Sequence, residues 1–157
     1  MPYQNPTLFG VAYASRLFRE VDAAQAYEKL RNETGPELDL QYPDNNGHAQ
    51  AMLNWLNSWG CRIDKKSPGQ LFQSLEKWFR QWKLRFPRAD IGLLDAEKRD
   101  FDVLADAYEA LLPIHDLGPT GASKLLFSIR PESAMAWDAA IQSAFQCPAS
   151  APMRQIG

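Results

Sequence analysis

The chain has 157 residues, of which 45% are hydrophobic and 23% are charged, and its formal net charge at pH 7 is −2. This length fits one ordinary domain, and no apolar run approaches the roughly 20 residues of a membrane span. We therefore expect a single domain over residues 1–157 that does not contact a membrane. The first residues lack the basic and apolar regions of a signal peptide, so we expect a cytoplasmic protein.

The first sixty residues divide into an arm and two helices. Residues 1–12 contain two prolines and little periodicity, which predicts an arm on the surface. Over residues 15–34, apolar side chains recur at spacings of three and four, which predicts a helix that ends at a Gly-Pro pair. Residues 35–47 have the composition of a loop, and a second, shorter helix is expected over 48–59.

The third predicted helix begins at Ser67 and Pro68, with Ser as the cap and Pro at the first helical position. We expect one face of this helix to be buried, because its apolar residues recur at helical spacing. The residues of that face are Leu71, Phe72, Leu75, Trp78, Phe79 and Trp82.

The same helix carries most of a basic segment. Residues 61–88 hold eight basic and two acidic side chains, whereas the flanking parts of the chain are acidic. A basic segment in an acidic chain indicates a surface for a polyanion, although a solvated helix face has the same pattern. The candidates for phosphate contacts are Lys77, Arg80, Lys83 and Arg85.

A further helix is expected after Asp95, which we predict to be its cap. Its apolar stripe includes Leu104, Tyr108 and Leu111, and its opposite face is acidic. No run of useful length alternates between apolar and polar residues as a strand would. The sequence therefore predicts an all-α fold of about six helices, followed by a flexible tail over residues 146–157.

Neither the cysteines nor the histidines form a recognisable metal or catalytic motif. The two cysteines, Cys61 and Cys147, are far apart and lack a C-x-x-C partner, so we expect buried small hydrophobic residues rather than a cluster site. His48 and His115 have no second ligand at metal spacing. No metal or cofactor is therefore predicted. His115 stands beside Asp116, but no Ser or Cys lies next to them in sequence to complete a nucleophile system.

The most specific part of the chain runs from residue 111 to residue 138. A helix is expected to end near Ile114, Gly118 permits a tight turn, and a second helix containing Ala122 follows. The segment Ile114–Ala122 resembles the helix-hairpin-helix motif, in which an apolar residue, Pro, Gly, an apolar residue and a second Gly precede an Ala. Residues 95–145 as a whole resemble the core of the helix-hairpin-helix DNA glycosylase superfamily.

This resemblance implies a DNA-binding protein that hydrolyses the N-glycosidic bond of a flipped nucleotide. The hairpin would present backbone N–H groups and a helix N-terminus to a DNA phosphate. Asp138 would be the catalytic carboxylate, whose negative charge stabilises the cation-like sugar and which also orients the attacking water, and Trp137 would line the pocket. The hairpin residues expected at the DNA are Gly118, Thr120, Gly121 and Lys124.

Two departures from the family pattern keep other functions open. Asp116 replaces the first hairpin glycine and places a carboxylate near the expected phosphate. Thr120 stands where lyase-type members carry a catalytic lysine, which argues against Schiff-base chemistry. One alternative is a DNA-binding module without catalysis. Another is a helical scaffold or protein-interaction module that has lost DNA binding, with Asp138 as a surface acid or a partner of Arg130.

Overall fold

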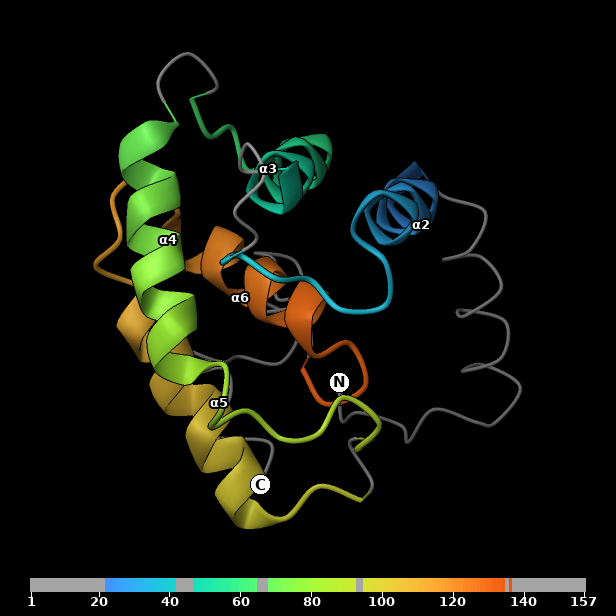
Figure 1. The fold of residues 1–157 in the computed structure, drawn as a ribbon, viewed down its shortest axis with the longest axis vertical. Helices are drawn as coiled ribbons and strands as arrows, with labels where there is room; N and C mark the ends of the chain where they lie inside the picture. The colour runs from blue at the N-terminus through green and yellow to red at the C-terminus, as the bar shows by residue number, and fades with distance from the viewer. Residues whose placement is uncertain (1–21, 42–46, 65–67, 93–94, 135, 137–157) are drawn as a thin grey trace, which may run out of the picture.

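The protein is all-helical in the part that its computed structural model describes, which comprises residues 22–41, 47–64, 68–92, 95–134 and 136 (Figure 1). These residues form five helices and no strand, which confirms the predicted fold class with one helix fewer than expected in the described part. The helices are α2 (Asp22–Thr34), α3 (Gly47–Ser58), α4 (Gly69–Trp82), α5 (Lys98–Leu111) and α6 (Gly118–Ile129). The predicted arm and tail lie outside the described residues.

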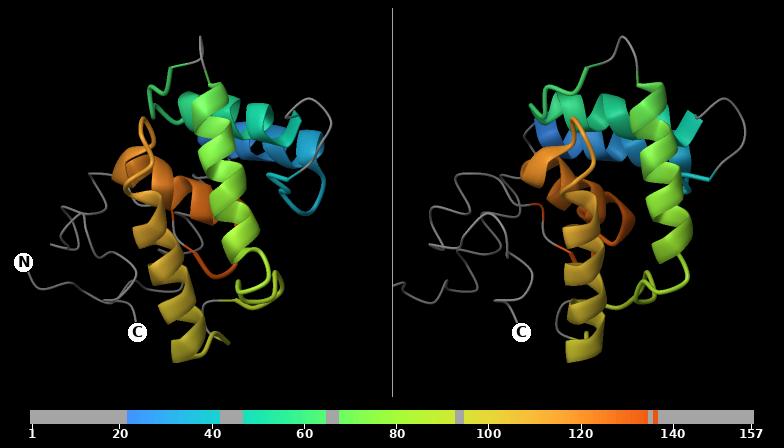
Figure 2. Two further views of the ribbon diagram at one scale, coloured as in Figure 1. Left: turned by 60° about the vertical axis from the view of Figure 1, so that its left-hand side comes forward. Right: turned by 90° about the vertical axis from the view of Figure 1, so that its left-hand side faces the viewer.

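Helix α6 lies at the centre of the arrangement. It packs against α3 and α5, while α2 packs on α3 and α4 packs on α5. Figures 1 and 2 show α6 between the α2–α3 pair and the α4–α5 pair. A helix that is surrounded in this way must be apolar on most sides. Accordingly, most residues of α6 are buried. The buried residues are Gly121, Ala122, Ser123, Lys124, Leu125, Leu126, Ser128 and Ile129.

The core is one continuous cluster to which all five helices contribute. The predicted apolar stripe of α4 is confirmed, because all six of its residues are buried. The indole N–H of Trp78 also donates a hydrogen bond to the Ala107 carbonyl at 2.9 Å, which joins α4 to α5. Each large side chain that is buried in this cluster contributes roughly 1.5–3 kcal/mol to folding.

The helix boundaries follow local backbone chemistry. Gly35 and Gly60 have φ angles of +73° and +78° and stand just after α2 and α3, where the sequence predicted both helices to end. The predicted Asp95 cap is wrong. Glu97 is the N-cap of α5, and the Asp100 carboxylate accepts a hydrogen bond from its backbone N–H at 2.9 Å. The Asp95 N–H instead bonds to the Gly92 carbonyl in a preceding turn.

Candidate functional site

A short turn, residues 112–117, joins α5 to α6, and one unusual backbone conformation lies within it and another directly after it. Asp116 has a φ of +69° and Gly118, the first residue of α6, has a φ of +62°. Glycine adopts such left-handed angles readily, whereas aspartate is one of the few other residues that tolerate them.

The N-terminus of α6 faces the solvent at this turn. Gly118 and Pro119 are exposed, no acidic residue lies in the first turn of the helix, and no side chain caps it. The positive end of the helix dipole is therefore available to an anion. Gly121, one turn further on, is buried, and a Cβ there would lie 3.0 Å from the Leu117 Cδ1 atom. A side chain at this position would therefore require the Leu117 side chain to shift by a few tenths of an ångström.

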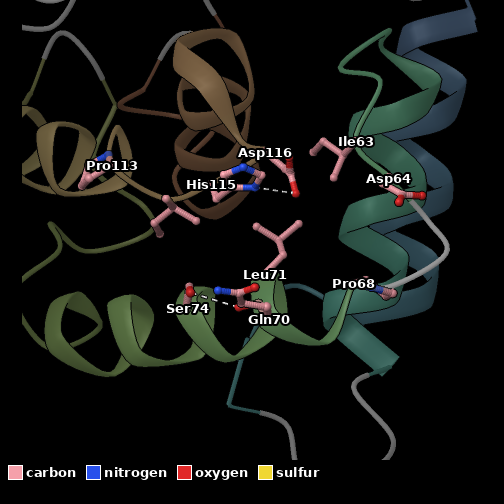
Figure 3. Close-up of a pocket in the computed structure, with 10 residues that line it drawn as sticks. Ile63, Asp64, Pro68, Gln70, Leu71, Ser74, Pro113, His115 and Asp116 are labelled. Carbon is pink, nitrogen blue, oxygen red and sulfur yellow. Dashed lines mark hydrogen bonds and ion pairs between the residues drawn. The ribbon is translucent and has the colours of Figure 1, made fainter.

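A pocket of about 290 Å³ lies beside the turn (Figure 3). On one side it is bounded by the turn, on the second by the segment after α3, and on the third by the first residues of α4. His115 and Asp116 are among the residues that line it, with the His115 Nδ1 atom 2.9 Å from the Asp116 Oδ2 atom. Its lining consists of Ile63, Asp64, Pro68, Gln70, Leu71, Ser74, Pro113, Ile114, His115 and Asp116.

Lys124 lies in the interior rather than at the hairpin surface. Only 6% of this residue is exposed, and its Nζ atom donates a hydrogen bond to the Trp59 carbonyl at 2.7 Å. The same ammonium lies 5.0 Å from the centre of the Trp59 ring. In this geometry Lys124 cannot reach a phosphate at the turn. Thr120, which is half-buried one helical turn earlier, lies closer to the exposed end of α6.

The basic residues of α4 face different directions. Lys77 follows Ser74 and Gln70 at helical spacing, so it continues the face of α4 that lines the pocket. Lys83 instead forms an ion pair with Asp39, between α2 and α3, at 2.7 Å. Partial burial alone would raise the pKa of the Asp39 carboxyl. Its hydrogen bonds from Lys83 and the Gln41 N–H outweigh this effect and lower that pKa.

The two remaining basic candidates also differ in their surroundings. Arg80 pairs with Glu76 at 2.7 Å on the solvent side of α4. The guanidinium of Arg85 lies 4.2 Å from the centre of the Trp82 ring, just beyond the end of the helix. Arg85 also borders a shallow groove with Arg88 and Arg99, whose charges are balanced by neighbouring carboxylates. Lys77 is therefore the basic residue of α4 that is best placed to contact an anion bound at the turn.

Arg130 fixes the end of α6, a role that sequence analysis missed. Its Nε atom donates to the Pro87 carbonyl at 2.7 Å, and its guanidinium lies over the Phe86 ring. Burial lowers the pKa of this guanidinium, against the opposing influence of Glu37. An arginine directly before a proline at a helix end was the available signal. The predicted catalytic residue Asp138 and its neighbour Trp137 lie outside the described residues.

Within the described segments, no three His, Cys, Asp or Glu side chains are arranged to hold a metal ion. Cys61 is a free thiol and half-buried rather than fully buried, and burial raises its pKa despite the nearby Lys124 ammonium. A thiol in these surroundings is a poor nucleophile. None of the described helices combines the length and apolar character that a membrane crossing needs.

Comparison with protein-family models, with curated proteins and with solved structures finds no match to this chain.

Proposed function

We propose that α5, the turn and α6 form a helix-hairpin-helix element that binds DNA. The observation that carries this proposal is the pair of left-handed residues, Asp116 and Gly118. The family pattern places glycine at both positions, and this backbone needs a positive φ at both. The agreement at Asp116 is informative because an aspartate seldom adopts this conformation without a structural requirement.

The physical basis of binding is the exposed start of α6. Free backbone N–H groups at a helix N-terminus, together with the dipole, bind a phosphate without reading the base sequence. Lys77, on the pocket-lining face of α4, supplies a cation for a second phosphate. Lys124 belongs to the core in this proposal, and the other α4 cations contribute less because Arg80 and Lys83 already have carboxylate partners.

We further propose glycosylase-like chemistry with Asp138 as the catalytic group. Its carboxylate would stabilise positive charge on the sugar as the bond to the base breaks, and a water would add at the sugar carbon. Thr120 occupies the position of the lyase lysine, so the product would be a free base and an intact abasic strand. Trp137 would stack beside the extruded nucleotide.

The competing function is a scaffold that binds protein, and the Asp116 carboxylate favours it. This group lies on the turn, two residues before Gly118, where it would repel a phosphate. A non-catalytic DNA-binding module is a third reading, which keeps the hairpin contact and gives Asp138 no chemical role.

Two assays separate these functions. Labelled duplexes with an abasic-site analogue, titrated at low and moderate salt, should bind with an affinity that falls steeply as salt rises. Duplexes with deaminated, alkylated or oxidised bases are then incubated with the wild type and with Asp138→Asn. Base release by the wild type alone supports the glycosylase. Equal binding without release by either protein indicates the non-catalytic module, and absence of binding leaves the scaffold.

A further inference from the structure

A contact between His115 and Asp116 lies on the turn where the proposed phosphate contact begins. The His115 Nδ1 and Asp116 Oδ2 atoms are 2.9 Å apart, and 88% and 49% of the two side chains are exposed. Figure 3 shows both side chains among the residues that line the pocket, with the interaction drawn between them. A histidine beside a carboxylate cancels its charge only when the imidazole is protonated. The net charge of the turn therefore depends on one proton.

The backbone keeps the Asp116 carboxylate in this place. Because Asp116 has a φ of +69°, its side chain leaves the turn in a direction that an ordinary conformation would not give. A hydrogen bond from the Leu117 N–H to the Ile114 carbonyl, at 3.3 Å, closes the turn around His115 and Asp116. Asp116 therefore lies in a closed turn, two residues before the first residue of α6.

Apart from His115, the described residues that line the pocket include no basic side chain. Asp64 contributes a second negative charge from the segment after α3, while Gln70 and Ser74 on α4 are neutral. The first turn of α6 carries no acidic side chain. Among the described lining residues, His115 is the only side chain that can become a cation. Lys65 and Lys66 follow Asp64 in the sequence and lie outside the described residues.

From this arrangement we infer that the His115–Asp116 pair makes DNA binding at the hairpin depend on pH. This inference rests on the proposed DNA-binding function. With a neutral His115, the Asp116 carboxylate repels the phosphate approaching the start of α6. Protonation of His115 cancels that charge, so affinity rises as the pH falls through the range in which histidines ordinarily titrate, about 5 to 8. The Asp116 carboxylate therefore weakens DNA binding, and protonated His115 removes this repulsion.

The test measures duplex affinity at about pH 5.5 and about pH 8, at one ionic strength, by fluorescence anisotropy. Because both side chains are substantially exposed, the wild type should bind on the order of threefold to fivefold more tightly at the lower pH. His115→Gln should bind weakly at both values. Asp116→Asn should bind more tightly than the wild type at pH 8, because the carboxylate that repels the phosphate is gone. Asp64→Asn is the matched control, which removes a carboxylate from the same pocket and keeps the pH ratio of the wild type.

The outcomes distinguish failure of this inference from failure of the proposed function. If the ratio of affinities at the two pH values is the same for the wild type and His115→Gln, the His115–Asp116 inference is overturned, while DNA binding itself still holds. The pH dependence would then arise from groups that all variants retain, such as the other histidine of the chain, His48. If no variant binds, including Asp116→Asn at low salt, the hairpin is excluded as a DNA contact. The pH dependence inferred from the His115–Asp116 pair is then excluded as well.

Discussion

The Nζ atom of Lys124 lies 2.7 Å from the carbonyl oxygen of Trp59, a residue 65 positions earlier in the chain. Trp59 follows directly after α3, so the ammonium of α6 stabilises the negative end of that helix. The lysine is buried and also lies against the Trp59 ring. A charge that is held in this way joins α6 to α3 and explains why a lysine is tolerated in the central helix.

Replacing this lysine should therefore affect stability rather than binding. Lys124→Met keeps most of the buried volume but leaves the Trp59 carbonyl without the ammonium, which should lower the free energy of unfolding by about 1–3 kcal/mol. Urea denaturation at neutral pH measures the loss. Lys98→Met, which removes an exposed partner of Asp102, is the control and should cost less than about 0.5 kcal/mol.

The contrary result for Lys124 is also informative. A Lys124→Met protein with the stability of the wild type and a weaker affinity for DNA would mean that this side chain leaves the interior and contacts phosphate.

The directions of the α4 lysines predict different effects on DNA binding. Lys77→Gln should weaken binding at every duplex sequence and reduce the slope of log affinity against log salt by about one. Lys83→Gln removes the same charge from the face that pairs with Asp39 and should leave the slope almost unchanged. Anisotropy titrations at four salt concentrations measure both slopes. Equal changes in the two variants would show that net charge, rather than position, determines the binding.

The Asp39 carboxylate should contribute to stability only above its own titration range. Its pKa is lowered in the folded protein, so it binds its proton more weakly there than in the unfolded chain. The stabilisation is present above the unfolded value of about 3.9 and is lost as the pH falls through the folded pKa. Wild type should therefore exceed Asp39→Asn in stability at about pH 7, and the difference should shrink at about pH 3.

Urea midpoints at the two pH values measure this difference, with Asp95→Asn, an exposed aspartate before α5, as the reference substitution. A stability difference for Asp39→Asn that is the same at both pH values would mean that the Lys83 pair does not form in solution.

Local patterns predicted much of the fold because they depend on neighbouring residues. The apolar stripe of α4 recurs at helical spacing, and the stops after α2 and α3 each contain a glycine with a positive φ. The partners of Lys124 and Lys83 could not be predicted, because each contact joins residues more than forty positions apart. A lysine among the apolar residues of α6 was the one local signal that its charge needed a buried partner.

The candidate site likewise has a part that local sequence predicted and a part that depends on how distant segments pack. The sequence identified Gly118 as the residue that permits the turn and Asp116 as its unusual neighbour, and both have positive φ angles. It did not indicate that Ser74, Gln70 and Asp64 would line a pocket with His115, since that requires α4 to pack beside the turn. The DNA role of these residues remains a proposal, and so does the catalytic role of Asp138.

The most direct test of the account compares two glycine variants in one DNA-binding assay. Gly118 and Gly35 both have positive φ angles, and a Cβ at either would meet no atom within 4 Å. Valine at either position should therefore impose a similar backbone strain, on the order of 1–2 kcal/mol. The account predicts that Gly118→Val abolishes salt-sensitive binding of an abasic-analogue duplex, whereas Gly35→Val binds like the wild type. Equal binding by both variants, or none by the wild type, would contradict the hairpin as the DNA contact.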